Sequence, residues 1–243
     1  MLQTLADGKT ILSAGEHEKV ARHYGVSSVY LSKEVRARMD DGRMTWKEFG
    51  GTHPKAPGNQ LAADLAVSIL DVAWKGTDGT FEIHEHPMPE LLEKTSFVNG
   101  QLLSPEVSAN EDWVYSEPDW KSIAGAKRER YLGRPMLHAS SPGAETQFAF
   151  EGSAVGVFIN AGPDAGQVDV QIDNGRWKTV DLFHRYSKGL HYPRTVMFAT
   201  DLKPGPHSLR VKVSDKKNSA SQGHAVRIIG FAVNGTQPPA EPQ

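Results

Sequence analysis

Two hydrophobic patterns follow one another along this chain, and the change between them lies near residue 75. Residues 14–74 carry apolar side chains mostly at helical spacing, and residues 57–74 form the clearest amphipathic pattern. Residues 97–233 instead carry short apolar runs that Gly, Pro, Asn and Asp interrupt. The first pattern predicts helices, and the second predicts β-strands.

The first part is expected to contain three helices and one short strand. In chain order these are a helix over 16–24, a strand over 26–31, a helix over 33–39 with Ser32 as its N-cap, and a helix over 57–74. A single strand has no sheet to join, so its backbone groups would lack partners. The sequence therefore predicts an α/β remnant, the end of an α/β sandwich.

The second part is expected to be an antiparallel β-sandwich of jelly-roll type. Phe148 and Phe150 lie on one face of an alternating run, and the Asp-Asn-Gly sequence at 173–175 predicts a hairpin with a type I′ turn. Such spacing and turn residues are typical of sandwiches and jelly rolls. The strands are expected over 145–150, 155–159, 168–172, 177–183, 195–199, 208–213 and 225–233.

These patterns divide the chain into four segments. We expect an α/β portion over 1–75, a connector over 76–96, a β-sandwich over 97–235 and a disordered tail over 236–243. The connector carries Gly and Pro residues that interrupt regular structure, and the tail is rich in proline.

Composition excludes several classes of protein. The chain has 27 Lys and Arg against 29 Asp and Glu, a net charge of −2, which argues against a nucleic-acid binder with a basic face. The absence of cysteine excludes disulfides, Cys-ligated zinc, iron–sulfur clusters and thiol catalysis. No apolar stretch is long enough for membrane insertion, and residues 1–4 do not read as the start of a signal peptide.

The Gly-Gly-Thr-His-Pro sequence at residues 50–54 is the sharpest local signal of chemistry. Two glycines permit a tight turn, and Pro54 favours an extended conformation at His53. The pattern predicts an imidazole held on a short loop just before a helix. A neutral imidazole there can take a proton from a serine hydroxyl and return it to a leaving alcohol, although an ordinary turn histidine would give the same pattern.

This stretch resembles the last sequence block of the SGNH (GDSL-type) hydrolases, where an Asp-x-x-His-Pro loop precedes the final helix of a flavodoxin-like α/β/α sandwich. His53, Pro54 and Gly58 match that block, and residues 16–31 are similar to the helix and strand before it. The resemblance implies an esterase or deacetylase with His53 as its general base. A bacterial subgroup of the family has a C-terminal β-sandwich accessory domain, and residues 150–152, 161–166, 172–173, 184–186 and 189–194 resemble that domain.

The chain also departs from that family. Gly50 stands where the family has the Asp that orients the histidine, so a Ser–His dyad is expected, unless Glu48 substitutes by another loop path. The chain contains no Gly-Asp-Ser nucleophile block and no Gly-x-Asn-Asp oxyanion block. We therefore expect the C-terminal part of a longer hydrolase, whose partner is the missing N-terminal part of the same domain.

Residues 184–194 concentrate aromatic and cationic side chains between two strands. Aromatic rings and hydrogen-bond donors together bind sugars, so this loop is a candidate for contact with a carbohydrate or another acyl-ester substrate; capping or docking of the sandwich is the alternative. The candidate substrate-binding residues are Trp177, His184, Arg185, Tyr186, His191, Tyr192 and Arg194.

We expect no metal site and no cofactor. His84, Glu85 and His86 are adjacent in a connector, where neighbouring side chains rarely converge on one ion. Asp164, Asp169, Asp173 and Asp181 lack the dense spacing of a calcium loop, so turn and surface roles are expected for them. Two further aromatic residues, Trp113 and Trp120, are expected to be part of a hydrophobic core.

Three hypotheses of function remain open from the sequence. The first is part of a serine esterase that hydrolyses acyl, in particular acetyl, esters on carbohydrate, with His53 as base. The second is a non-catalytic carbohydrate-binding β-sandwich with a vestigial helical part. The third is a fragment that does not fold independently. The resemblance implies that the intact parent is exported, to the periplasm or the outside of a bacterium.

Overall fold

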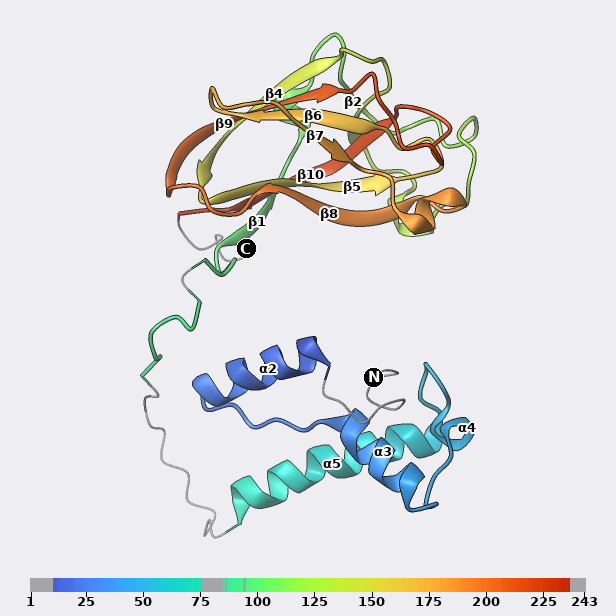
Figure 1. Ribbon diagram of the computed structural model, residues 1–243, viewed down its shortest axis with the longest axis vertical. Coiled ribbons are helices and arrows are strands. Elements are labelled where there is room, and N and C mark those ends of the chain that lie inside the picture. The colour runs from blue at the N-terminus through green and yellow to red at the C-terminus, as the bar shows by residue number, and fades with distance from the viewer. Residues whose placement is uncertain (1–10, 76–84, 86, 94, 237–243) are drawn as a thin grey trace. The chain divides into compact units, whose positions relative to one another are not determined.

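The computed structural model (Figure 1) describes residues 11–75, 85, 87–93 and 95–236. It divides into two compact units, residues 1–94 and 95–243, which we call the helical unit and the sandwich unit. The predicted fold class is confirmed: an α/β remnant made of helices precedes an antiparallel β-sandwich of two sheets. Within the described residues, no helix has the length and apolar character needed to cross a membrane.

The described part of the helical unit contains a long C-terminal helix and three shorter ones. Helix α4 was not predicted from the sequence; it is a single turn that begins at a capping box, in which Thr45 and Glu48 satisfy each other's backbone N–H groups. The helices are α2 (Leu12–His23), α3 (Leu31–Asp40), α4 (Trp46–Phe49) and α5 (Ala56–Trp74).

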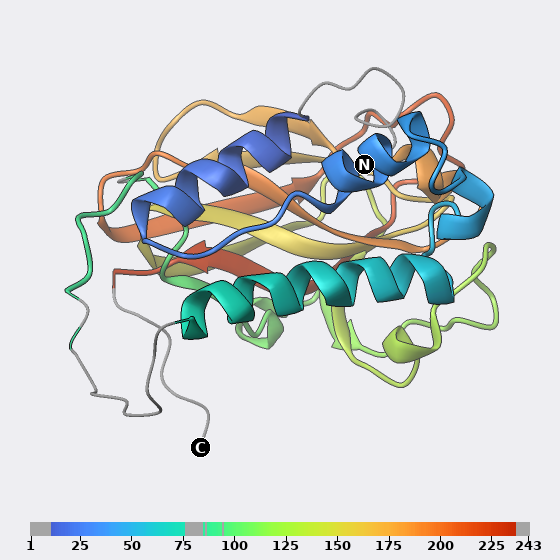
Figure 2. The same ribbon diagram turned by 90° about the horizontal axis from the view of Figure 1, so that it is seen from below.

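The strand predicted over 26–31 is wrong, and so is the N-cap predicted at Ser32. Residues 26–30 run extended between α2 and α5 (Figure 2), but they pair with no strand in the described chain. Helix α3 already begins at Leu31 with Tyr30 as its N-cap, so Ser32 lies inside its first turn and is buried. A β-type run becomes a strand only where a neighbouring strand offers hydrogen bonds.

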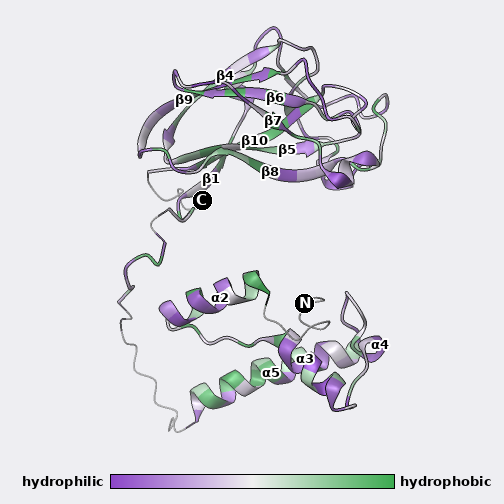
Figure 3. Cartoon of the chain, viewed as in Figure 1, coloured by the Kyte–Doolittle hydropathy of each residue, from purple (hydrophilic) through white to green (hydrophobic). Residues whose placement is uncertain are grey.

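The helical unit has a small core and leaves much of α5 uncovered. Val35, Phe49 and Leu61 are its fully buried apolar residues. Helix α5 is apolar along most of its length (Figure 3); Leu65 packs partly against this core, but four of its large apolar side chains are exposed to solvent. Their exposed fractions are 52% for Val67, 43% for Leu70, 75% for Val72 and 56% for Trp74. Apolar surface gathered in this way on one helix marks a site of association.

The sandwich unit consists of two antiparallel sheets. One has the order β2-β3-β10-β5-β8, with β1 also paired to β10, and the other has the order β4-β9-β6-β7. The strands are β1 (Gly100–Leu103), β2 (Val114–Ser116), β3 (Met136–Ala139), β4 (Glu145–Gly152), β5 (Ala154–Ala161), β6 (Gln167–Ile172), β7 (Lys178–Asp181), β8 (Tyr192–Ala199), β9 (Gly205–Val213) and β10 (Val226–Asn234).

The core of the sandwich lies between the two sheets. Phe148 of β4 stacks on Phe231 of β10 with their ring centroids 3.9 Å apart, which joins one sheet to the other. Trp113 is fully buried in this core, and Trp120 is buried in a smaller cluster beside it, so the core positions predicted for both are confirmed. The alternation predicted for Phe148 and Phe150 is also confirmed, because both side chains are buried.

The predicted hairpin between β6 and β7 is confirmed, but its predicted turn type is wrong. Gly175 N–H donates to Ile172 O at 3.0 Å, and among the described residues Asp173 is the non-glycine residue with a positive φ, 53°. The Asp173 carboxylate accepts hydrogen bonds from Ser208 N–H at 3.0 Å and from His207 Nδ1 at 2.9 Å. These bonds to β9 hold Asp173 in the left-handed conformation. The predicted type I′ turn instead requires positive φ at Asn174 and Gly175.

Two truncations on one helix test how unevenly α5 is covered. Leu61→Ala empties a position that is 2% exposed, so we expect it to lower the free energy of unfolding of the helical unit by about 2–5 kcal/mol. Val72→Ala changes a position that is 75% exposed, so we expect a change within about 0.5 kcal/mol. Urea titration of the full chain, followed by far-ultraviolet circular dichroism, measures both. Equal effects of the two variants would contradict the described packing.

Candidate functional site

His53 lies on a short closed loop between α4 and α5. Lys55 N–H donates to Phe49 O at 2.8 Å and so closes the loop. Gly50 and Gly51 both have positive φ, 112° and 74°. A Cβ at Gly50 would lie 2.3 Å from the backbone nitrogen of Lys55, so only glycine fits at this point. The loop therefore presents His53 just before α5, as the sequence pattern predicts.

The imidazole of His53 is exposed to solvent. Glu48, the carboxylate considered as its orienting partner, is used elsewhere. Its Oε2 accepts hydrogen bonds from Thr45 N–H at 2.7 Å and from Thr45 Oγ1 at 2.8 Å. These bonds from the Thr45 side chain and backbone hold the pKa of Glu48 below its usual value. Glu48 thus caps α4, and the described residues offer His53 no hydrogen-bonded carboxylate.

A cluster of aromatic side chains forms where residues 184–194 join β7 to β8. His184 stacks on Tyr192 with ring centroids 4.8 Å apart, and Tyr186 lies 5.1 Å from His184 and 5.2 Å from Tyr192. The guanidinium of Arg185 sits 4.8 Å from the Tyr186 ring centroid and donates to Tyr186 Oη at 3.1 Å. Tyr186 is 49% exposed, so the cluster offers an aromatic surface to solvent. We call His184, Arg185, Tyr186 and Tyr192 the loop cluster.

Buried hydrogen bonds hold the loop cluster in place. Ser187 is fully buried; its Oγ donates to Ala161 O at 2.9 Å and accepts from His184 N–H at 3.2 Å. His184 Nδ1 accepts from Tyr186 N–H at 3.3 Å, which requires that nitrogen to be unprotonated. Burial, and then the charges of Arg194 and Arg185, lower the pKa of His184. The imidazole is therefore neutral at pH 7 and lies beside two cations.

Two of the predicted substrate-binding residues lie apart from this cluster. His191 is fully buried, donates through Nε2 to Ala124 O at 2.9 Å and packs edge-on against Trp120. Trp177 precedes β7, and its ring contacts Lys212 and Arg210 of β9. The structure thus brings together His184, Arg185, Tyr186 and Tyr192, places Arg194 near His184, and separates Trp177 and His191 from them.

Sequence reasoning did not single out Arg227 or the Ser116–His138 contact. Arg227 is 6% exposed and forms two hydrogen bonds to the carboxylate of Asp164, at 2.9 and 2.6 Å. Burial acts to raise the pKa of Asp164, but the bonds and charge of Arg227 outweigh it and keep that pKa low. Ser116 Oγ lies 3.0 Å from His138 Nε2. The described residues give His138 no second hydrogen-bond partner, so this pair lacks the third group of a catalytic triad.

The aspartates considered as calcium ligands have other partners. Asp164 pairs with Arg227, Asp169 accepts from Thr179 at 2.6 Å, and Asp181 accepts from Asn218 at 2.6 Å. Across the described residues, no three His, Cys, Asp or Glu side chains are grouped to hold a metal ion. His84 and His86 lie outside the described residues.

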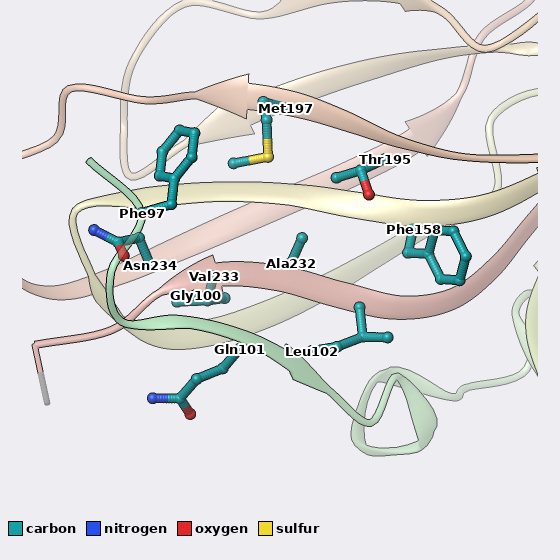
Figure 4. Close-up of a pocket in the computed structure, with 10 residues that line it drawn as sticks. All are labelled: Phe97, Gly100, Gln101, Leu102, Phe158, Thr195, Met197, Ala232, Val233 and Asn234. Carbon is teal, nitrogen blue, oxygen red and sulfur yellow. The ribbon is translucent and has the colours of Figure 1, made fainter. Parts of the chain in front are cut away.

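A cavity of about 450 Å³ opens on the outer face of the larger sheet (Figure 4). Phe97, Phe158 and Met197 line it, together with residues of β1 and β10. The carboxamide of Asn234, one of its few polar groups, is already bonded to Asn99 N–H and Ser153 Oγ. The cavity therefore offers mainly apolar contact, and none of the residues that line it has an acidic or basic side chain.

The buried His191 makes an acid-sensitive contribution to stability. Burial lowers the pKa of His191, so the folded state favours the neutral ring, and the stability this gives is lost as the pH falls through the usual histidine value of 6.5. We expect His191→Asn to lose less stability than the wild type between pH 8 and pH 5, measured by urea unfolding at each pH.

The comparison with wild type isolates this effect. His207 acts with the opposite sign, because its hydrogen bonds to Lys203 and Asp173 raise its pKa, but it is present in both proteins. His17→Asn, on the exposed surface of α2, serves as a control and should keep the wild-type pH dependence. The same pH dependence in His191→Asn and wild type would rule out the assignment to His191.

Comparison with known proteins gives a likeness of fold. No protein-family model matches the chain, and no curated protein matches it. A crystal structure of a two-domain esterase (CEX) active on acetylated mannans, co-crystallised with mannopentaose, is 16% identical with a TM-score of 0.65 and covers 98% of this chain and 61% of that one. A second structure of such an esterase is 18% identical with a TM-score of 0.62, over 92% of this chain and 59% of that one.

The chain therefore spans about three fifths of the length of these esterases. A family two carbohydrate esterase from Cellvibrio japonicus matches with 17% identity over 60% of this chain and 34% of that one, at a TM-score of 0.34, which is too low to compare. Because the identities are below 20%, these comparisons show a similarity of fold alone. In that fold, a helical segment followed by a β-sandwich, this chain is similar to solved carbohydrate esterases.

Proposed function

We propose that this chain is the C-terminal part of an SGNH-type serine esterase that hydrolyses acyl, in particular acetyl, esters on carbohydrate. Residues 1–75 are then the end of the catalytic α/β domain, and residues 97–235 are its β-sandwich accessory domain. The observation that carries the proposal is an exposed His53 on a closed loop before α5, in a chain whose fold follows a two-domain acetyl-mannan esterase over 98% of its length.

His53 has the position that a general base needs. Its ring is exposed, and no hydrogen bond within the described chain occupies it. A neutral imidazole in this setting takes the proton of a serine hydroxyl as the oxygen attacks the ester carbonyl, and then returns it to the leaving alcohol. Since Glu48 caps α4 and Gly50 has no side chain, the arrangement supports a Ser–His dyad rather than a triad.

The serine and the oxyanion-hole donors are proposed to come from the part of the α/β domain that this chain lacks. Three features support this. Residues 26–30 are extended without a neighbouring strand in the described chain, α5 carries exposed apolar side chains, and the chain spans about three fifths of the related esterases. A β-strand laid beside residues 26–30 would offer hydrogen-bond partners in addition to the bonds that Val26 N–H and Tyr30 O already form with Ala21 O and Lys33 N–H.

The loop cluster, with Arg194 beside it, is proposed to contact the carbohydrate. Tyr186 and Tyr192 supply aromatic faces, and Arg185 supplies hydrogen-bond donors next to them. Because Ser187 anchors the loop through buried hydrogen bonds, little ordering is needed when a ligand binds.

The second candidate function is a non-catalytic carbohydrate-binding module. The loop cluster favours it as much as it favours the esterase, because sugar binding there does not depend on His53. The two functions are distinguished by whether His53 matters for turnover, since a binding module would show none.

Extension of the chain tests the catalytic proposal. We expect the chain alone to hydrolyse p-nitrophenyl acetate and acetylated mannan no faster than buffer. Loss of a single oxyanion-hole donor lowers kcat by about 10²–10³, and the proposal places both these donors and the nucleophile outside this chain. We expect a protein extended by an upstream, in-frame Gly-Asp-Ser block to hydrolyse both substrates.

In that extended protein, His53→Ala should lower kcat/KM by about 10²–10⁴, the usual contribution of a general base. His17→Ala, a change at an exposed histidine of α2, should leave it unaltered. Turnover by the chain alone that depends on His53 would contradict the assignment of the serine to a part outside this chain. The esterase proposal fails if the extended protein is equally active with and without His53.

Substitution of Tyr186 tests the role of the loop cluster. We expect Tyr186→Ala to weaken binding of mannopentaose by about tenfold, measured by isothermal titration calorimetry of the full chain, because a tenfold change corresponds to about 1.4 kcal/mol and one aromatic contact is of that size. Phe97→Ala removes an exposed aromatic residue elsewhere on the sandwich unit and should have no effect. Equal affinities of wild type and Tyr186→Ala would exclude the cluster as a sugar site.

A further inference from the structure

The outer face of the smaller sheet is covered by polar side chains that stand in register across three strands. Gln147 of β4 and Gln171 of β6 both pair with Arg210 of β9, and Asp169 of β6 pairs with Lys212 of β9. Side chains two residues apart on a strand share a face, so Arg210 and Lys212 stand side by side. Together these residues form two polar rows across the sheet.

Hydrogen bonds connect these side chains before any ligand is present. Arg210 donates from Nε to Glu145 Oε1 at 2.6 Å and from a terminal nitrogen to Gln171 Oε1 at 2.9 Å. Thr179 Oγ1 donates to Asp169 at 2.6 Å on the neighbouring strand. The polar rows are therefore held in a fixed arrangement, which lowers the ordering cost of binding.

The indole of Trp177 lies over this face. Its ring centroid is 4.4 Å from Lys212 Nζ and 5.0 Å from Arg210 Cζ. Trp177 precedes β7, and β6 separates β7 from β9, so the ring reaches across β6 to make these contacts. The ring contacts both cations while Trp177 stays 38% exposed, so part of the residue is open to solvent.

We propose that Trp177 and the polar rows beneath it form a second carbohydrate-binding surface, separate from the loop cluster, for a neutral oligosaccharide chain. The indole offers a flat face for the C–H side of a sugar ring, and Gln147, Asp169 and Gln171 offer acceptors and donors for hydroxyl groups. Trp177 precedes β7 and His184 follows it, so the two surfaces lie at opposite ends of that strand. This inference rests on the proposed carbohydrate-directed function.

Affinity electrophoresis of the full chain in gels containing soluble β-mannan tests the proposal. We expect Trp177→Ala to raise the dissociation constant for β-mannan, obtained from the retardation, about tenfold. Trp177→Phe should retain most of the wild-type affinity, because phenylalanine keeps an aromatic face. We expect the double variant Trp177→Ala, Tyr186→Ala to bind β-mannan more weakly than either single variant, because the effects of substitutions at separate sites on the free energy of binding add. Trp74→Ala, at an exposed tryptophan of the helical unit, is the matched control and should bind as wild type does.

The outcomes separate this inference from the proposed function. If Tyr186→Ala weakens binding and Trp177→Ala does not, the second surface is refuted and the loop cluster stands. If wild type binds neither β-mannan nor mannopentaose, the carbohydrate-directed function is refuted and this inference falls with it. Melting temperatures of all variants confirm folding. The tryptophan fluorescence of the Tyr186→Ala protein should change on titration with β-mannan, and the added substitution Trp177→Phe should abolish that change; this control is needed because four other tryptophans stay in place.

Discussion

An extended backbone needs a hydrogen-bonded neighbour, and this requirement separates the two units of the chain. In the sandwich unit every long strand has partners, and β10 is paired on both edges, by β5 on one side and by β1 and β3 in succession on the other. In the helical unit residues 26–30 are extended but pair with no strand of the described chain. The same unit exposes large apolar residues on α5, so within the described chain residues 26–30 have no paired strand and part of α5 has no apolar cover. A sheet that packs against α5 and adds a strand beside residues 26–30 would satisfy both needs.

Elements with long, regular patterns were predictable from the sequence. The amphipathic run of 57–74 became α5, within one residue at its start, and the alternation around Phe148 and Phe150 became β4. The three strands that were missed, β1 to β3, have three or four residues each, too few to show a period. Asp173 was misjudged for another reason: its bonds to Ser208 and His207 come from β9, more than 30 residues away, and outweigh the local preference of Asn-Gly.

In the candidate sites, too, the placements that depend on sequence neighbours were predictable, and those that depend on residues distant in the chain were not. The placement of His53 follows from neighbours in sequence, because two glycines and the bond from Lys55 to Phe49 form the loop. The capping role of Glu48 also depends on a sequence neighbour, Thr45, three residues before it. The Thr-x-x-Glu pattern of a capping box is visible in the sequence. The separation of His191 and Trp177 from Tyr186 was not visible, because it depends on which side of which sheet each residue faces. His191 sits next to Tyr192 in the chain, yet it packs on Trp120, about 70 residues earlier.

The distance between the loop cluster and Trp177 matters for the kind of ligand that the two proposed surfaces would bind. The seven steps from Trp177 to His184 span at most about 23 Å, at about 3.3 Å per residue. One polymer chain that contacts both surfaces binds the second as an intramolecular event, with an effective concentration far above that of free ligand. A short oligosaccharide that occupies only one surface gains nothing from the other. The two proposed surfaces on one sandwich would therefore favour long glycans over short ones without any single strong contact, and such selection would hold the proposed esterase on a polymer that carries many esters.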